Sequence, residues 1–256
     1  MIVFGVFMDF FYLALLGFFS GISSSLFGIG GGTIIVPALL LMGYDTPFAV
    51  GISILQMIFA SFFGSYLNYR KNLIDLKNGI TLGMGGLIGS SFSGMILTHT
   101  SVQVLHIAFF IFTFLSFYKY FFTSSKHYVC QKTTNLKSVL ILLLSGVVVG
   151  VFASSLGIGG GLLLAPILGY FLGLNSKEVV PLALFFVCFS STSGAISLYE
   201  AGFVHLHSGI VVGIFSMVGV VLGQKILSSL TPKTHKLILG GIYLASMSIT
   251  LYKILC

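Results

Sequence analysis

The sequence has very few charged residues. Only 7% of its 256 residues are Asp, Glu, Lys or Arg, whereas 57% are apolar. Soluble domains carry about a quarter charged residues, so this composition excludes an ordinary soluble protein and indicates a polytopic membrane protein. Acidic residues are the scarcest: five stand against twelve Lys and Arg, which gives a net charge of +7. The basic residues lie between apolar segments, where they orient a chain in a bilayer rather than bind nucleic acid.

Other absences exclude further classes. The three cysteines, Cys130, Cys188 and Cys256, have no metal or redox spacing, so we expect neither a disulfide framework nor a metal site. The first residues have no basic region and no cleavage site, so they lead into a spanning segment rather than form a signal peptide. No nucleotide-binding P-loop, hydrolase triad or pair of carboxylates in one span is present. We therefore expect no enzyme, no catalytic residue and no cofactor.

Charged groups are also absent from the centres of the apolar segments, where they usually mark ion or proton routes. Most of these segments have about 20 residues and are long enough to span a bilayer as helices. Two have only about 11 residues, roughly 16 Å of helix, which is too short to cross alone. The expected segments are 8–27, 33–43 (short), 46–68, 73–97, 103–122, 137–155, 162–172 (short), 177–199, 204–229 and 235–254.

One five-residue stretch occurs twice, and each copy leads into a short segment. Gly21 to Gly32 reads GISSSLFGIGGG, and Gly150 to Gly161 reads GVFASSLGIGGG, with seven of twelve positions identical at an offset of 129. Further glycines match at an offset of 130, for example Gly64 with Gly194. The sequence therefore predicts two copies of one unit, each with a glycine-broken or re-entrant helix hairpin whose backbone must be buried or line a wet cavity.

The basic residues predict how the two copies are oriented. If each glycine hairpin enters and leaves on one side and the loop at 69–77 is cytoplasmic, eleven of the twelve Lys and Arg fall inside. Each copy then crosses the membrane an odd number of times, so the second copy is inverted and both termini lie outside. We expect an all-α protein with a first transmembrane repeat at 1–122, a cytoplasmic linker at 123–136 and an inverted second repeat at 137–256. Inverted repeats with broken helices are typical of secondary transporters that bind substrate near the midplane.

The glycine motifs are candidate anion sites. The first N–H groups of a helix lack internal partners and carry the positive end of the dipole, and a glycine-rich turn lets a ligand approach the main chain. Two such starts, inverted, would face one small oxyanion at the centre of the protein. The alternative is that the glycines only allow close helix packing. The candidate binding residues are Gly28, Gly30, Gly31, Gly32, Gly157, Gly159, Gly160 and Gly161.

Polar side chains near the motifs are further candidates. Serines precede both motifs, and their hydroxyls donate either to a bound oxygen or to the carbonyl one turn back. Gln56 is the most polar side chain well inside an expected span, where it contacts either substrate or a neighbouring helix. The predicted substrate contacts are Ser25, Ser154, Ser155, Gln56 and Ser191, with Pro37 and Pro166 as structural residues at the same distance from each motif.

The two GIGGG motifs, each with its downstream proline, resemble the TauE/SafE family of sulfite exporters, and the likeness extends from about Gly17 to Ile254. The resemblance implies a multi-pass carrier of the prokaryotic inner membrane that moves sulfite or related sulfur-containing or organic anions. We therefore expect a secondary transporter of sulfite, thiosulfate or an organosulfonate, bound near the midplane between the two motifs. The alternative is a membrane subunit or enzyme that passes a sulfur species to a partner protein. The expected partners are a small anion and the lipid bilayer, and a homo-oligomer is left open.

Overall fold

A computed structural model describes residues 2–122 and 136–255, and every regular element in these ranges is a helix. The expected all-α class with apolar, membrane-length helices is confirmed. The helices are α1 (Ile2–Phe27), α2 (Gly32–Leu41), α3 (Thr46–Arg70), α4 (Leu76–Ser90), α5 (Ser93–His99), α6 (Val102–Phe122), α7 (Leu136–Ser155), α8 (Gly161–Leu172), α9 (Ser176–Glu200), α10 (Leu206–Ser229) and α11 (Pro232–Leu255). The expected linker at 123–136, with Lys126, Cys130 and Lys132, lies outside the described residues except for its last position.

Five stretches of the described helices are long and apolar enough to cross a membrane, namely 10–27, 46–70, 76–99, 176–200 and 206–229. The helices after the glycine motifs, α2 and α8, have 10 and 12 residues and do not reach that length. One expected segment, 73–97, is divided, because the chain leaves α4 at Ser91 and Phe92 and starts α5 at Ser93. Gly89 accepts from the Phe92 N–H at 3.4 Å, a bond over three residues that closes the helix.

Polar caps fix the starts of the helices that enter the apolar body. The Asn175 side chain accepts from the N–H groups of Lys177 and Glu178, and the Glu178 carboxylate accepts from the Asn175 N–H at 2.9 Å. This reciprocal capping satisfies N–H groups that have no partner within the helix. Asp75 caps α4 by accepting from Lys77 and Asn78. Short polar turns therefore separate the long apolar helices.

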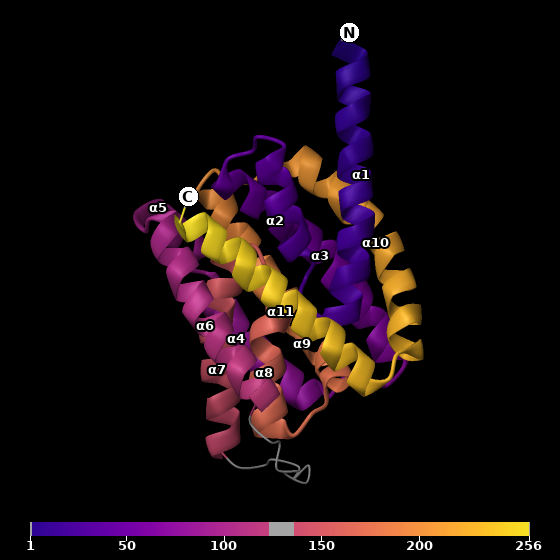
Figure 1. The fold of residues 1–256 in the computed structure, drawn as a ribbon, viewed down its shortest axis with the longest axis vertical. Helices are drawn as coiled ribbons and strands as arrows, with labels where there is room; N and C mark the ends of the chain where they lie inside the picture. Colours follow the sequence, from indigo (N-terminus) through magenta and orange to yellow (C-terminus); the bar gives the residue numbers. More distant parts are fainter. Residues whose placement is uncertain (1, 123–135, 256) are drawn as a thin grey trace.

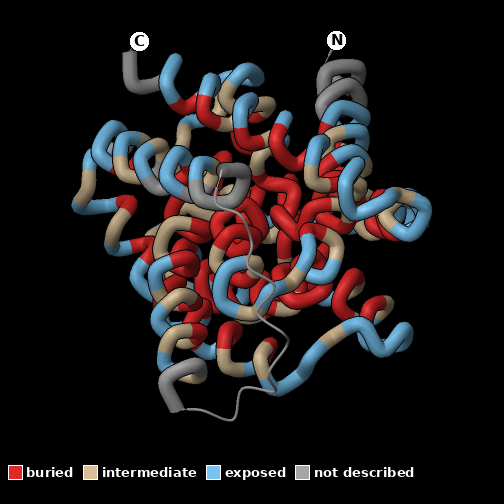
Figure 2. Tube along the Cα trace, turned by 60° about the horizontal axis from the view of Figure 1, so that its bottom comes forward, coloured by how far each residue is buried: buried red, intermediate tan, exposed pale blue. Residues whose placement is uncertain are grey.

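The central pair of the bundle is α3 and α9, which pack against one another. On one side α1 packs along α10, and on the other side α4 packs along α7 (Figure 1). At the offset of the sequence repeat α1 corresponds to α7 and α10 to α4, so the two outer pairs are equivalent contacts. Buried residues gather in the centre of this arrangement, and exposed residues lie on the outer helices (Figure 2).

Glycine allows the outer helix pairs to pack closely. A Cβ on Gly21 of α1 would overlap the Ser216 carbonyl of α10, and a Cβ on Gly85 of α4 would overlap the Leu143 carbonyl of α7. Small residues at helix contacts are the usual way for membrane helices to approach. The packing explanation for glycine therefore holds at these positions, which are outside the two motifs.

Two lysines form hydrogen bonds between the ends of neighbouring helices. The Lys71 ammonium donates to the Gln224 side-chain oxygen at 3.0 Å, which joins the end of α3 to the end of α10. The Lys177 ammonium donates to the Leu230 carbonyl at 2.6 Å, which joins the start of α9 to the turn before α11. The start of α1 and the end of α11 lie toward the opposite end of the bundle in Figure 1. The side of the membrane that each end faces remains a prediction.

Candidate functional site

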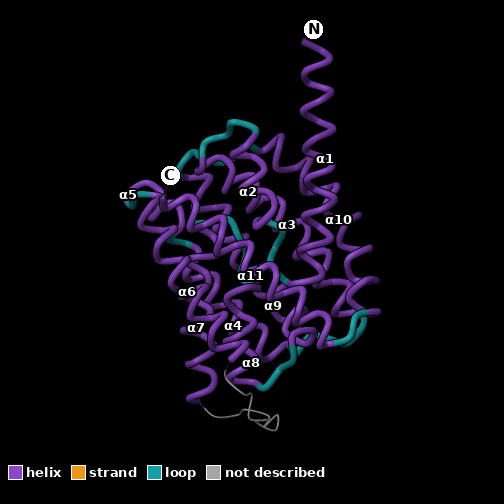
Figure 3. The backbone as a smooth tube through the Cα atoms, viewed as in Figure 1, coloured by secondary structure: helices purple, strands orange, loops and turns teal. Residues whose placement is uncertain are grey.

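The two glycine motifs cross in direct backbone contact. A Cβ on Gly32 would overlap the carbonyl oxygen of Gly157, and a Cβ on Gly161 would overlap the carbonyl of Gly28. These two contacts are equivalent in the two copies, since Gly28 corresponds to Gly157 and Gly32 to Gly161. Both loops are buried, and Figure 3 shows loop segments inside the body of the helices. The structure thus brings together two motifs that are 129 positions apart.

The central helices flank this crossing. The Ser53 hydroxyl of α3 donates to the Gly157 carbonyl at 2.7 Å, and both groups are buried. The corresponding residue of α9 is Ala183, whose Cβ lies against Gly28. One crossing contact therefore has a hydrogen bond that the other lacks.

Each motif ends at the start of a short helix whose first N–H groups are free. Gly31 caps α2 and Gly160 caps α8, and neither cap has a side-chain hydrogen bond. In the described part of the chain the N–H groups of Gly32 and Thr33 make no hydrogen bond. These are the groups that bind anions at a helix N-terminus.

The two caps differ in backbone conformation. Gly28 and Gly157 have φ of 69° and 62°, and Gly30 and Gly159 have φ of 77° and 78°. At the cap itself the equivalence ends: Gly31 is left-handed with φ of 79°, whereas Gly160 has φ of −88°. Only the first cap therefore requires glycine for its backbone conformation.

The side chains beside the two caps differ even more. The Gln56 carboxamide packs against Gly31; it is fully buried, and neither Oε1 nor Nε2 has a partner among the described residues. The corresponding residue in the second copy is Phe186, whose ring packs against Gly160 and is also fully buried. A polar amide therefore lies at the start of α2, and an aromatic ring at the start of α8.

The helix before each motif continues this difference. In α1, Ser20 and Ser24 are fully buried, the Ser20 carbonyl lies beside Gly31, and the Ser24 hydroxyl has no partner in the described ranges. The corresponding residues of α7 are Val149 and Ala153, which belong to the apolar core. Ser20 and Ser24 are four residues apart and share one face of α1. These two positions of α1 are therefore polar and those of α7 apolar, whereas Ser155, the counterpart of Leu26, gives the second motif a buried hydroxyl without a partner in the described ranges.

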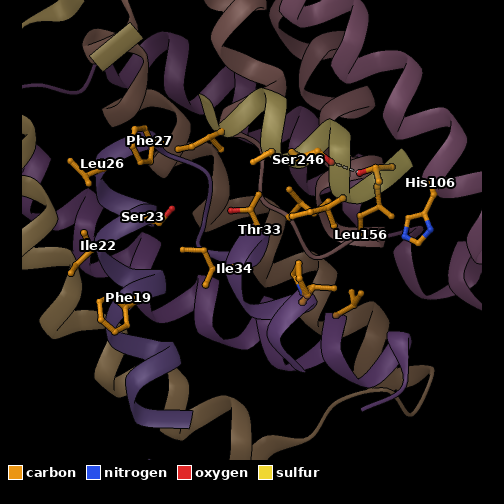
Figure 4. A pocket seen from close by; sticks show the side chains of 18 of the residues that line it. Phe19, Ile22, Ser23, Leu26, Phe27, Thr33, Ile34, His106, Leu156 and Ser246 are labelled. Atoms are coloured by element: carbon orange, nitrogen blue, oxygen red, sulfur yellow. Dashed lines mark hydrogen bonds between the residues drawn. The ribbon is translucent and has the colours of Figure 1, made fainter. Parts of the chain in front are cut away.

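A cavity of about 480 Å³ lies beside α2, between α1 and α11. Its walls are mostly apolar, but the hydroxyls of Ser23 and Thr33 are turned into the space between them (Figure 4). Thr33 is the second residue of α2, so the cavity reaches the helix start. In the second repeat the short helix α8 is covered by α6. The counterpart of α6 is α11, which has no comparable packing against α2 in the residues described. The cavity therefore lies along α2, and Leu156 and Ile158 beside Gly157 also form part of its wall.

Two contacts of α11 were missed from the sequence. His235 is fully buried; its Nε2 is 2.7 Å from the Leu26 carbonyl, and its ring stacks on Phe27 at 5.4 Å. The Tyr243 hydroxyl donates to the Leu162 carbonyl at the start of α8. Partners more than 80 positions away leave no local pattern, although polar residues on an apolar helix were a signal that could have been followed.

The other predicted residues lie in several environments. The Ser25 and Ser191 hydroxyls donate to carbonyls of their own helices, those of Ile22 and Val187. The Ser154 hydroxyl donates across to the Ser190 carbonyl of α9 at 3.3 Å. The remaining three are a buried Ser155 hydroxyl without a partner in the described ranges, Pro37 on the cavity wall and Pro166 buried within α8.

The family can now be assigned. The model of the sulfite exporter TauE/SafE family matches residues 13–249, which include both motifs and all helices that surround them. The chain belongs to the TauE/SafE family. The resemblance noted from the glycine motifs is thereby confirmed.

Curated relatives of this TauE/SafE protein are named as membrane transporters. A probable membrane transporter protein of Methanocaldococcus jannaschii, MJ0441, is 27% identical over 90% of this chain and 91% of its own length. Bacillus subtilis YdhB, another probable membrane transporter protein, is 27% identical over 86% of this chain and 91% of its own length. No solved structure matches the chain. The protein is thus a membrane transporter rather than an enzyme.

Proposed function

We propose that this TauE/SafE protein is a secondary transporter of a small sulfur-containing anion such as sulfite, thiosulfate or an organosulfonate. The anion binds where the two glycine motifs cross, near the middle of the membrane. The observation that carries the proposal is the crossing of two buried motifs, each of which starts a short helix with unpaired N–H groups. Neutral donors and a helix dipole suit an oxyanion in a protein whose spans hold no charged residue near their centres.

The packing of the helices supports two inverted repeats as the framework of this transporter. The contact of α1 with α10 is equivalent to that of α7 with α4, because α1 corresponds to α7 and α10 to α4. The corresponding helices α3 and α9 pack on one another at the centre. Each repeat contains one helix broken at its glycine motif, which is the usual construction of a midplane site in secondary transporters. The framework proposed has repeats at 1–122 and 137–256.

Transport by the protein alone tests the proposal. The purified chain in liposomes is expected to move labelled sulfite or thiosulfate into vesicles, and the rate should saturate with concentration. Protein-free liposomes are the control for leakage. If no sulfur anion of the panel moves and none binds, the proposal fails. A membrane subunit that passes sulfur to a partner would bind the anion but show no flux without that partner.

Orientation has a separate test. The proposal puts both termini outside and the linker with Cys130 in the cytoplasm of a cell whose inner membrane holds the protein. After replacement of Cys188 and Cys256 by Ala, a membrane-impermeant maleimide should label Cys130 only once the membrane is opened. Labelling of intact cells would reverse the orientation.

A further inference from the structure

The Gln56 side chain has no structural explanation in the resting fold. Its carboxamide can donate two hydrogen bonds and accept two, yet it makes none with the described residues and is fully buried. A buried amide without a partner is unfavourable, and such groups in folded proteins commonly mark a ligand or a functional site. Gln56 lies against Gly31, the N-cap of α2. The unpartnered amide and the free helix start therefore face the same point.

The second motif shows that the fold itself does not need this amide. There Phe186 takes the place of Gln56, and Val149 and Ala153 take the places of Ser20 and Ser24. The backbone crossing is nevertheless present on both sides. The polar groups around Gly31 are thus additional to what holds the two motifs together.

We propose that the transporter holds its anion at the first motif alone, with Gln56 and Ser24 as the side chains that bind it. The Gln56 Nε2 and the Ser24 hydroxyl donate to the anion, together with the free N–H groups of Gly32 and Thr33. The ligand is a small sulfur oxyanion or sulfonate, and this assignment rests on the proposed function. The second motif, sealed by Phe186, is a fixed support for the first.

The cavity beside α2 gives the anion a route to this site. It reaches Thr33, two residues beyond Gly31, and carries the Ser23 and Thr33 hydroxyls on otherwise apolar walls. On the side of the second motif α6 packs against α8. Access and polar lining thus occur at the same motif.

The test compares equivalent substitutions at the two motifs. Binding of sulfite, thiosulfate and ethanesulfonate to the purified full-length protein is measured by calorimetry. Gln56→Leu should weaken the best-bound probe about tenfold or more, because it removes a hydrogen bond to a charged ligand. Ser24→Ala should weaken it about threefold to tenfold. The matched controls, Phe186→Leu and Ala153→Ser, should change the affinity by less than about twofold.

Thermal unfolding separates a binding role from a structural one. Gln56→Leu removes no hydrogen bond of the ligand-free fold, so its Tm without anion should equal or exceed that of the wild type. The rise in Tm on adding the anion, which follows from binding to the native state, should disappear. A lowered Tm with unchanged affinity would make Gln56 a structural residue and overturn the proposal.

The remaining outcomes are also decisive. If the wild type binds an anion and Phe186→Leu weakens it as much as Gln56→Leu, both motifs hold the ligand and the one-sided site is wrong. If Gln56→Leu acts only by abolishing a sodium dependence, seen by exchange of sodium for potassium, the amide binds a cation instead. If the wild type binds no probe, the proposed function itself fails, and the Gln56 assignment with it.

Discussion

At the first glycine motif the cap of α2 lies beside the Ser20 carbonyl and the Gln56 carboxamide, whereas at the second the cap of α8 lies against the Phe186 ring and Leu164. The two motifs are nevertheless alike where they cross, because each places a glycine against a carbonyl oxygen of the other. The repeated part is therefore the backbone contact, and the part that differs is the lining of the helix start. In a duplicated protein, shared residues indicate what the fold requires, and unshared ones indicate where one copy has a task of its own.

The largest effect is expected at the crossing, and there the two motifs should respond alike. Gly32→Ala and Gly161→Ala each force a Cβ into the carbonyl of the opposite loop. Both should lower the free energy of unfolding by about 3 kcal/mol or more, as severe overpacking does. The midpoint of thermal unfolding in detergent measures this.

A helical glycine with free space is the control for this pair. A Cβ on Gly241 of α11 would have no neighbour within 4 Å, so Gly241→Ala should leave the midpoint unchanged or slightly raised. A midpoint that falls for only one of the two crossing variants would show that the loops are not equivalent even where they touch.

A moderate effect is expected at the caps, with a different cause on each side. Gly160→Ala keeps an acceptable φ, and its Cβ overlaps chiefly the Phe186 ring, so Phe186→Leu should recover much of its cost of about 1–3 kcal/mol. Gly31→Ala forces a side chain into a left-handed conformation at a cost of about 1–2 kcal/mol. The new Cβ would also meet the Ser20 carbonyl and the Gln56 carboxamide, so Gln56→Ala should recover only the part of the cost that comes from the carboxamide.

A double-mutant cycle on unfolding free energies measures both couplings. If the second substitution restores the stability lost in Gly31→Ala as fully as that lost in Gly160→Ala, the two caps do not differ in cause. The first cap would then be limited by space and not by its backbone conformation.

A smaller effect is expected from the hydrogen bond that occurs on one side only. Ser53→Ala removes the donor to the Gly157 carbonyl and should cost about 1 kcal/mol in unfolding free energy. The second copy has Ala183 at this position, so the crossing should survive the change. Ser228→Ala, an exposed hydroxyl bonded within its own helix, is the control and should have no measurable effect. An equal loss in both variants would remove any special role from Ser53.

Much of the fold could be predicted because it depends on composition and length. The expected segment 46–68 is found as Thr46–Arg70, and the short segment 162–172 as Gly161–Leu172. Apolar runs bounded by polar caps leave little freedom in a bilayer. The break between α4 and α5 could not be predicted, because glycine and serine at 89–91 are also tolerated within membrane helices.

The candidate site could be predicted only in part. The motifs were found because they are identical, and the same search passed over the positions where the copies differ. A comparison of the aligned copies for positions that differ would have paired Gln56 with Phe186 and Ser24 with Ala153. The cavity beside α2 depends on how α11 lies, which no local pattern in the sequence encodes.

The smallest effect is expected from pH, and it concerns the first motif alone. Gln56, Ser24 and main-chain N–H groups do not titrate near neutrality, so the affinity for a sulfonate should change less than about twofold between pH 6 and 8. Sulfite itself titrates in this range and serves as the comparison, since its affinity should follow its own protonation. If the sulfonate's affinity changes tenfold, a histidine is coupled to the site. His106, which lines the cavity beside α2, and His235, which contacts Leu26 in the last turn before the motif, would then be tested before His99, His205 and His207. His235→Gln keeps a donor for that carbonyl but removes the titration, so it should restore a flat profile.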